Sequence, residues 1–100
     1  MSAKRQKLNE GDISSRLKNL EGWTYQHGKP HREYQFADFV HAFGFMATAA
    51  IAIEAMEHHP EWSNVWNRVV VDLTTHDSGG ITAKDILLAG KLEALAKRLQ

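Results

Sequence analysis

The sequence predicts one α+β domain with the element order α-β-β-α-β-β-α, in which a four-stranded antiparallel sheet carries the helices on one face. Apolar residues recur at helical spacing in two segments, and a third, longer segment between them is apolar on nearly every side of a helix. Short β-type runs occur in two pairs, each around turn-forming residues. With 100 residues, 43% hydrophobic and 24% charged, the chain has the composition of a single folded domain. We expect residues 1–7 to form a flexible tail and residues 8–100 to form the domain.

The first and last helices are amphipathic. Ile13, Leu17 and Leu20 share one face of a short helix, for which Asp12 is the predicted N-cap and Gly22 the stop. Thr82, followed three residues later by Asp85, resembles a capping box at the start of the last helix. The apolar stripe of that helix consists of Leu88, Leu92, Leu95 and Leu99.

Four strands are predicted between these helices, in two hairpins. They are residues 23–26 and 32–36 around a loop at 28–30, and residues 62–66 and 69–75 around a turn at 67–68. In the last strand Val69, Val71, Leu73 and Thr75 alternate with more polar residues, so one face is expected to be buried.

The middle helix is expected to run from an N-cap at Asp38 to about residue 58. It is apolar nearly all round and rich in alanine, so one 100-residue domain can hardly cover it. We therefore expect the protein to self-associate, as a homodimer or homotetramer, through this helix.

Composition argues against several classes of function. Lys plus Arg and Asp plus Glu both number 12, and a neutral balance argues against direct nucleic-acid binding. Cysteine is absent, which excludes thiolate chemistry and is compatible with a reducing compartment such as the cytoplasm. The longest low-charge stretch, residues 39–53, falls short of the roughly 20 residues of a membrane span, so no membrane association is expected. We interpret the basic segment at residues 4–7 as a solvated terminus rather than a nuclear localisation signal. Because no apolar segment follows it, a secretory signal is not expected.

Three histidines are the strongest candidates for chemistry, because imidazole exchanges protons near neutral pH. Pro60 is expected to make His58 the last helical residue and His59 the first extended one, while His76 ends the last strand. Glu54 lies one helical turn before His58, so its carboxylate is expected to face that ring and favour the protonated form. Asp85, in the first turn of the last helix, is close in sequence to His76, from which a glycine loop separates it.

Each of these residues can also have a purely structural role. Histidines are common at helix C-termini, Asp85 can serve only as a cap, and Trp66 can be a hairpin residue. Three histidines can also ligate zinc, although adjacent histidines rarely aim at one ion and the His-x-x-x-His spacing is missing. A serine hydrolase is disfavoured because there is no Gly-x-Ser-x-Gly turn.

The segment Glu54-Ala55-Met56-Glu57-His58-His59-Pro60, followed by Trp66, His76 and Asp85, resembles the active-site signature of the pterin-4a-carbinolamine dehydratase family. The resemblance extends from about Trp23 to Ala89. It implies a lyase that dehydrates 4a-hydroxytetrahydrobiopterin to quinonoid dihydropterin in tetrahydrobiopterin recycling, without a metal or cofactor.

The resemblance also implies roles for individual residues. The catalytic residues would be His58, His59 and His76, of which His58 and His76 would be the acid–base pair and His59 would mainly hold the pterin. The residues implied to bind the substrate, including these histidines, are Glu54, Glu57, His58, His59, Pro60, Trp66, Thr74, Thr75, His76, Asp77 and Asp85.

Members of this family are similar in forming dimers and tetramers through the middle helix, here residues 38–58. Some animal members also bind a dimeric homeodomain transcription factor through it. The alternative function is therefore a dimerization cofactor, or coactivator, of such a factor. The expected location is the cytoplasm, with entry into the nucleus by diffusion.

Overall fold

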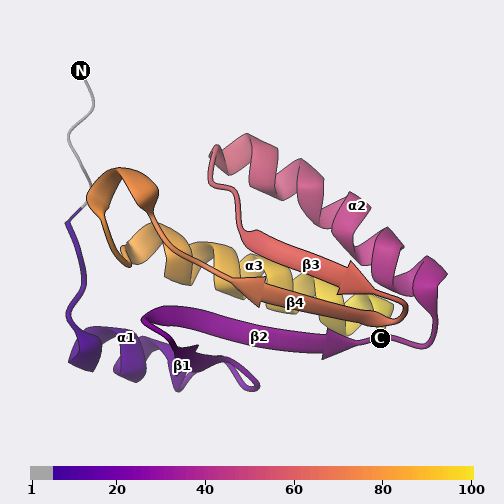
Figure 1. The fold of residues 1–100 in the computed structure, drawn as a ribbon, viewed down its shortest axis with the longest axis horizontal. Helices are drawn as coiled ribbons and strands as arrows, with labels where there is room; N and C mark the ends of the chain where they lie inside the picture. Colours follow the sequence, from indigo (N-terminus) through magenta and orange to yellow (C-terminus); the bar gives the residue numbers. More distant parts are fainter. Residues whose placement is uncertain (1–5) are drawn as a thin grey trace.

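The computed structural model describes residues 6–100 and has the predicted order of helices and strands (Figure 1). Residues 1–5, most of the predicted tail, lie outside the described residues. The elements are α1 Glu10–Leu17, β1 Thr24–Gln26, β2 Lys29–Gln35, α2 Phe39–Met56, β3 Glu61–Val65, β4 Arg68–Asp72, the 3-10 helix η1 His76–Ser78 and α3 Ala83–Leu99. The predicted α+β class is confirmed.

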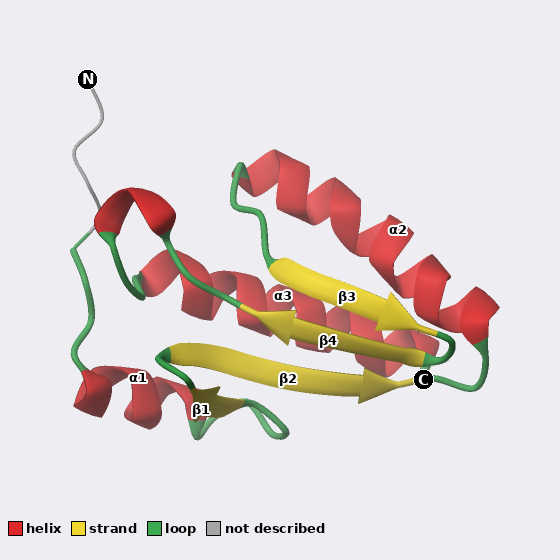
Figure 2. Cartoon of the chain, viewed as in Figure 1, coloured by secondary structure: helices red, strands yellow, loops and turns green. Residues whose placement is uncertain are grey.

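The four strands form one antiparallel sheet in the order β1-β2-β4-β3. The long helices α2 and α3 lie together on one face of it (Figure 2). Residues that point away from the helices, such as Glu33, Ser63 and Arg68, are exposed. One face of the sheet therefore forms the core and the other carries a charged surface.

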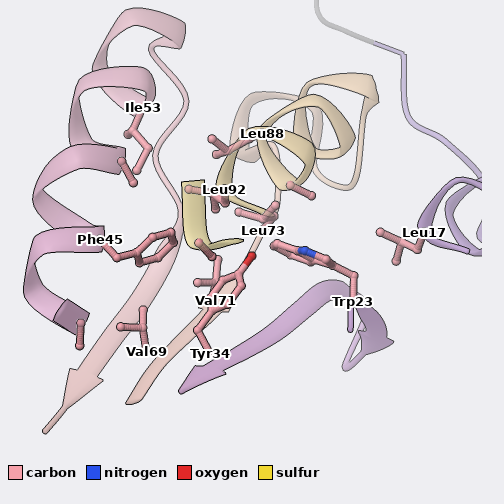
Figure 3. Packing of buried hydrophobic residues seen from close by; sticks show 14 of the residues in the cluster. Leu17, Trp23, Tyr34, Phe45, Ile53, Val69, Val71, Leu73, Leu88 and Leu92 are labelled. Carbon is pink, nitrogen blue, oxygen red and sulfur yellow. The ribbon is translucent and has the colours of Figure 1, made fainter. Parts of the chain in front are cut away.

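The core lies between the helix-facing side of the sheet and the two long helices (Figure 3). Val69, Val71 and Leu73 are completely buried on that side, which confirms the predicted alternation. Phe45 from α2 packs on Tyr34 from β2, with ring centroids 5.1 Å apart. Burying each such side chain stabilises the fold by about 1.5–3 kcal/mol relative to leaving it in water.

The first helix begins earlier than predicted. Its N-cap is Asn9, whose side-chain oxygen accepts a hydrogen bond from the backbone N–H of Asp12 at 2.8 Å. The prediction that Asp12 is the cap is therefore wrong. This residue lies in the first turn, where its negative charge interacts favourably with the positive end of the helix dipole. The helix ends at Leu17, and Leu20 follows in a turn.

The first hairpin is tighter than predicted. His27 and Gly28 alone form its turn, with φ angles of 52° and 78°, as in a two-residue hairpin loop of the primed type. Pro30 lies inside β2 opposite Tyr25, not in a loop at residues 28–30. Proline has no N–H to donate, but its carbonyl still serves the sheet by accepting from Leu73 N–H at 3.0 Å.

The second hairpin is displaced by one residue from the prediction. Trp66 and Asn67 form the turn, and Trp66 is left-handed with a φ of 50°. The side-chain amide of Asn64 donates to the carbonyls of Trp66 and Arg68 at 3.0 and 2.8 Å, which stabilises the turn at this position. Strand β3 consequently begins at Glu61, a residue that the prediction left outside the strand.

The helix α2 is covered on one side only. Its buried residues face the sheet and α3, whereas Phe39, Val40, Phe43 and Ile51 are 48–74% exposed. Within residues 6–100, α2 is the one helix that is long and apolar enough to cross a membrane, contrary to our expectation that no segment would be. Length and composition are weak evidence for a membrane span, because the core helix of a globular domain has the same properties.

A buried carboxylate ties α3 to the sheet. Glu93 is 7% exposed, and its Oε1 accepts from the Trp23 indole and the Tyr34 hydroxyl, both at 2.9 Å, and from Arg32 Nε at 3.2 Å. Burial and the neighbouring carboxylate raise the pKa of Tyr34, so its hydroxyl stays a donor. The Arg32 guanidinium also stacks on the Tyr34 ring, 4.4 Å from its centroid.

We expect Glu93→Ala to lower the free energy of unfolding by about 3–5 kcal/mol, because it leaves a half-buried guanidinium and two buried donors without their acceptor. Urea denaturation followed by circular dichroism measures this loss. The control is Glu21→Ala, which removes an exposed carboxylate and should change the value by less than about 0.5 kcal/mol. Equal effects of the two substitutions would contradict the interpretation.

Candidate active site

The C-terminal end of α2 sets the direction of the histidines that follow it. The helix ends at Met56, and Glu57 is left-handed with φ 52° and ψ 42°. Glu57 N–H bonds Glu54 O at 3.1 Å and His58 N–H bonds Ile53 O at 3.3 Å, the paired bonds of a Schellman motif. The prediction that His58 is the last helical residue is wrong, because this left-handed turn takes the chain out of the helix before it.

His58 points into the protein and is held by a buried carboxylate. It is 7% exposed, and its Nε2 lies 2.6 Å from Oδ1 of Asp85, which is completely buried in the first turn of α3. The other oxygen, Oδ2, accepts from the Thr75 hydroxyl at 2.7 Å and from Thr82 N–H at 2.9 Å. Both carboxylate oxygens are therefore engaged, and the predicted capping box is confirmed.

The two threonines form an ordered hydrogen-bond chain behind this carboxylate. A hydroxyl has one proton, and Thr75 uses it toward Asp85. In the 2.8 Å contact between the hydroxyls, Thr82 must therefore donate to Thr75. The Thr82 oxygen in turn accepts from Lys84 N–H at 3.2 Å. The direction of every bond follows from the fold, so the position of the Asp85 carboxylate is fixed.

This arrangement assigns the His58 tautomer. A carboxylate accepts, so Nε2 carries the proton toward Asp85 and Nδ1 is left as the second ring nitrogen. Among residues 6–100, Nδ1 bonds no protein group, and no buried side-chain nitrogen or oxygen lacks a partner. Nδ1 is thus the solvent-facing atom, able to accept a proton and then to donate it.

His59 turns the opposite way, onto the surface. Its Nε2 lies 3.0 Å from Glu54 Oε1, and both side chains are largely exposed. The expectation that Glu54 would face His58 is wrong for this reason: the left-handed residue between them directs His58 inward and leaves His59 beside the helix. Two neighbouring histidines thus have separate carboxylate partners.

His76 opens η1 and lies on the same side of the molecule as the start of β3. Its side chain is 71% exposed, and its Nε2 is 3.5 Å from Oε2 of Glu61. Glu61 stands two residues after His59, so this contact brings His76 to the chain segment that carries the other two histidines. The Thr75 bond to Asp85 also joins the residue before His76 to the partner of His58.

The other predicted site residues fall into three groups. Thr75 and Asp85 are buried and support His58 from behind. Thr74 is half-buried, Asp77 is exposed in η1, Glu57 is exposed, and Pro60 is half-buried just before β3. Trp66 is not brought to the histidines within one chain: it is separated from Glu61 by the length of β3, roughly 15 Å.

Sequence reasoning did not single out Glu61 as a site residue, nor Lys29, whose Nζ lies 2.6 Å from Glu61 Oε1. Glu61 directly follows the His-His-Pro segment, and this position was a sequence feature that could have marked it as a site residue. Nothing in the sequence pointed to Lys29. Within residues 6–100, no group of three His, Asp or Glu side chains is placed to hold a metal ion. A cavity of about 370 Å³ lined by Gln6, Lys7, Leu8, Asp12 and Ala83 contains none of the predicted site residues.

Comparison with known proteins identifies the family. The family model described as pterin 4 alpha carbinolamine dehydratase matches residues 6–95, which include every predicted site residue. The chain belongs to this family. A pterin-4-alpha-carbinolamine dehydratase of Solibacter usitatus, so named only provisionally, is 64% identical over 90 residues, covering 90% of this chain and 95% of the relative. A provisionally named dehydratase of Chelativorans is 47% identical and covers 94% and 98% of the two chains.

Two solved structures share the fold of this pterin dehydratase family member. One, described as a transcriptional coactivator/pterin dehydratase from Brucella melitensis, has a TM-score of 0.87 and 44% identity, over 91% of this chain and 99% of the other. The second is a pterin dehydratase-like protein described as a RuBisCO assembly factor, with a TM-score of 0.66, 19% identity, and coverage of 77% and 92%. The second likeness concerns the fold alone.

We expect Thr75→Val to lower the free energy of unfolding by about 1–3 kcal/mol, because Asp85 Oδ2 loses a donor and the buried Thr82 hydroxyl loses its acceptor. Thr75→Ser keeps the hydroxyl and should retain most of that stability. Thermal unfolding of the two variants measures the difference. A valine variant as stable as the serine variant would show that the hydrogen-bond chain does not hold this site.

Proposed function

We propose that the protein catalyses dehydration of 4a-hydroxytetrahydrobiopterin to quinonoid dihydropterin and water, as a step in tetrahydrobiopterin recycling. The observation that carries the proposal is the buried His58–Asp85 pair, which leaves one imidazole nitrogen facing solvent. Family membership supports the substrate, because the family description names the carbinolamine. The elimination consists of proton transfers and departure of water, and therefore requires no metal or organic cofactor.

Two protons move in this reaction. The 4a-hydroxyl must gain a proton to leave as water, and the proton on ring N5 must be removed as the double bond forms. We assign these transfers to Nδ1 of His58 and to the ring of His76. His59, held beside Glu54, is proposed to bind the pterin. If His58 and His76 approach opposite faces of the flat ring, each protonates the 4a-hydroxyl group of one stereoisomer.

Stopped-flow absorbance with synthetic 4a-hydroxytetrahydropterin tests the proposal. We expect fast dehydration by the wild type and a loss of about 10²–10⁴-fold in His58→Ala and His76→Ala, as for removal of a general acid or base. His41→Ala is the control, because His41 is exposed near the start of α2 and pairs with Asp38. A wild type that does not accelerate the spontaneous reaction would overturn the proposed activity.

We also propose that the protein forms homodimers or homotetramers through α2. The support is the row of exposed apolar side chains on that helix, since large apolar patches on a monomer commonly mark interaction sites. Small residues, including the exposed Ala47 and Ala50, allow another helix to approach closely.

Phe43→Glu should reduce the molecular mass measured by sedimentation equilibrium to that of a smaller species, because a carboxylate at the interface must be desolvated. Leu87→Glu changes a residue of similar exposure on α3 and should leave the assembly intact. An assembly unaffected by Phe43→Glu, or a wild type that is monomeric at every concentration, would contradict association through α2.

The second candidate function is that of a dimerization cofactor or coactivator for a homeodomain transcription factor. The Brucella melitensis relative is described as a transcriptional coactivator as well as a pterin dehydratase, and the exposed face of α2 offers a surface for such a partner. Binding through α2 should survive His58→Ala and His76→Ala, which separates this function from catalysis. The cytoplasmic location, with diffusion into the nucleus, remains part of the same proposal.

A further inference from the structure

The three histidines share a pattern that the sequence does not reveal. Each has one carboxylate facing its Nε2: Asp85 for His58, Glu54 for His59, and Glu61 for His76. Asp85 is immobilised by its buried hydrogen bonds, whereas Glu54 is largely exposed and has no second partner among residues 6–100. Glu61 is intermediate, because it is half-exposed but fixed by a cation.

Lys29 fixes this third carboxylate from the far side of β4. Its Nζ lies 2.6 Å from Glu61 Oε1, while Oε2 of the same carboxylate faces His76. Lys29 comes from β2 and Glu61 from β3, so the contact spans the strand between them. The hydrogen bond from Lys29 lowers the pKa of Glu61, and the hydrogen bond to Glu61 raises the pKa of Lys29. The pair is therefore charged at neutral pH.

The charges around this pair are few and can be named. Asp72 of β4 lies opposite Glu61 in the sheet and contributes to the raised pKa of Lys29. Asp72 also lies 2.7 Å from Nδ1 of His31, and Glu33 lies 2.9 Å from the other ring nitrogen, so His31 pairs with these two carboxylates and not with Glu61. Asp77 follows His76 in η1. Glu61 is the one carboxylate in residues 6–100 with an ion pair to the His76 ring.

We propose that Glu61, held by Lys29, is a positioning residue for His76: it keeps the proton of the neutral ring on Nε2 and leaves Nδ1 free to face the pterin. The inference rests on the proposed dehydratase activity and adds two residues to its machinery. A contact of 3.5 Å is long for a hydrogen bond, and catalytic contacts of this kind commonly shorten in the complex with the substrate. Exposed ion pairs contribute little to stability. We therefore expect the loss of Glu61 to change kcat and the His76 tautomer rather than the free energy of unfolding.

The first test uses Glu61→Gln, with Glu33→Gln as the matched control. Glu33 is an exposed carboxylate on the same face of the sheet, paired with His31 and Arg68 rather than with His76. The ¹⁵N chemical shifts of the neutral His76 ring report which nitrogen carries the proton. We expect Nε2–H to dominate in the wild type and in the control, and to fall in Glu61→Gln because an amide also donates.

The kinetic test uses the same variants and the stopped-flow assay. We expect kcat to fall about fivefold in Glu61→Gln, the factor that an exposed ion pair can supply, with KM and melting temperature nearly unchanged. Glu61→Asp keeps the charge and should recover part of kcat. Lys29→Met should return the pKa of the Glu61 carboxyl, followed by ¹³C resonance, toward its ordinary value.

These outcomes separate the two proposals. An active wild type whose kcat and His76 tautomer are both unchanged by Glu61→Gln would overturn the positioning role and leave the dehydratase intact. A wild type without activity would overturn the dehydratase, although the tautomer change in Glu61→Gln would still establish the pairing. An unchanged Glu61 pKa in Lys29→Met would remove Lys29 from the proposal.

Discussion

The carboxylate of Asp85 is the contact on which the arrangement of the site depends. It joins three segments that are distant in the sequence: the end of α2 through His58, the end of the sheet through Thr75, and the start of α3 through the Thr82 cap. Because Asp85 is completely buried, these bonds form without competition from water. The same carboxylate thus caps α3 and orients His58, the proposed acid–base residue.

The helix α3 uses acidic residues on its buried side for two different tasks. Asp85, in its first turn, serves the candidate active site, and Glu93, two turns later, accepts bonds from Trp23, Tyr34 and Arg32 in the core. A buried carboxylate is tolerated only where its lone pairs are used. Both residues meet that condition, which is why the helix can bring negative charge inside the domain without loss of the fold.

Much of the fold was predictable, because α3 and β4 follow the periodicity that their packing requires. The errors occurred where side chains or single left-handed residues decide the outcome: Asn9 as the cap of α1, Trp66 in the second hairpin, and Glu57 at the end of α2. The three histidines and Asp85 were selected as candidates from residue type and family resemblance. The pairing of Glu54 with His59, and the role of Lys29, depend on tertiary geometry that no local pattern contains.

The contrast between a buried His58 and an exposed His76 has a consequence for changing the specificity of this protein. Any substitution at His58, Thr75 or Asp85 disturbs the helix cap and the core together, so variants there would be selected mainly for folding. The surface formed by His59, Glu61 and His76 is free of that restriction. A library aimed at other ring systems would therefore keep the inner half and the proposed catalytic ring of His76 constant, and would vary the exposed positions around them, where substitutions leave the core intact.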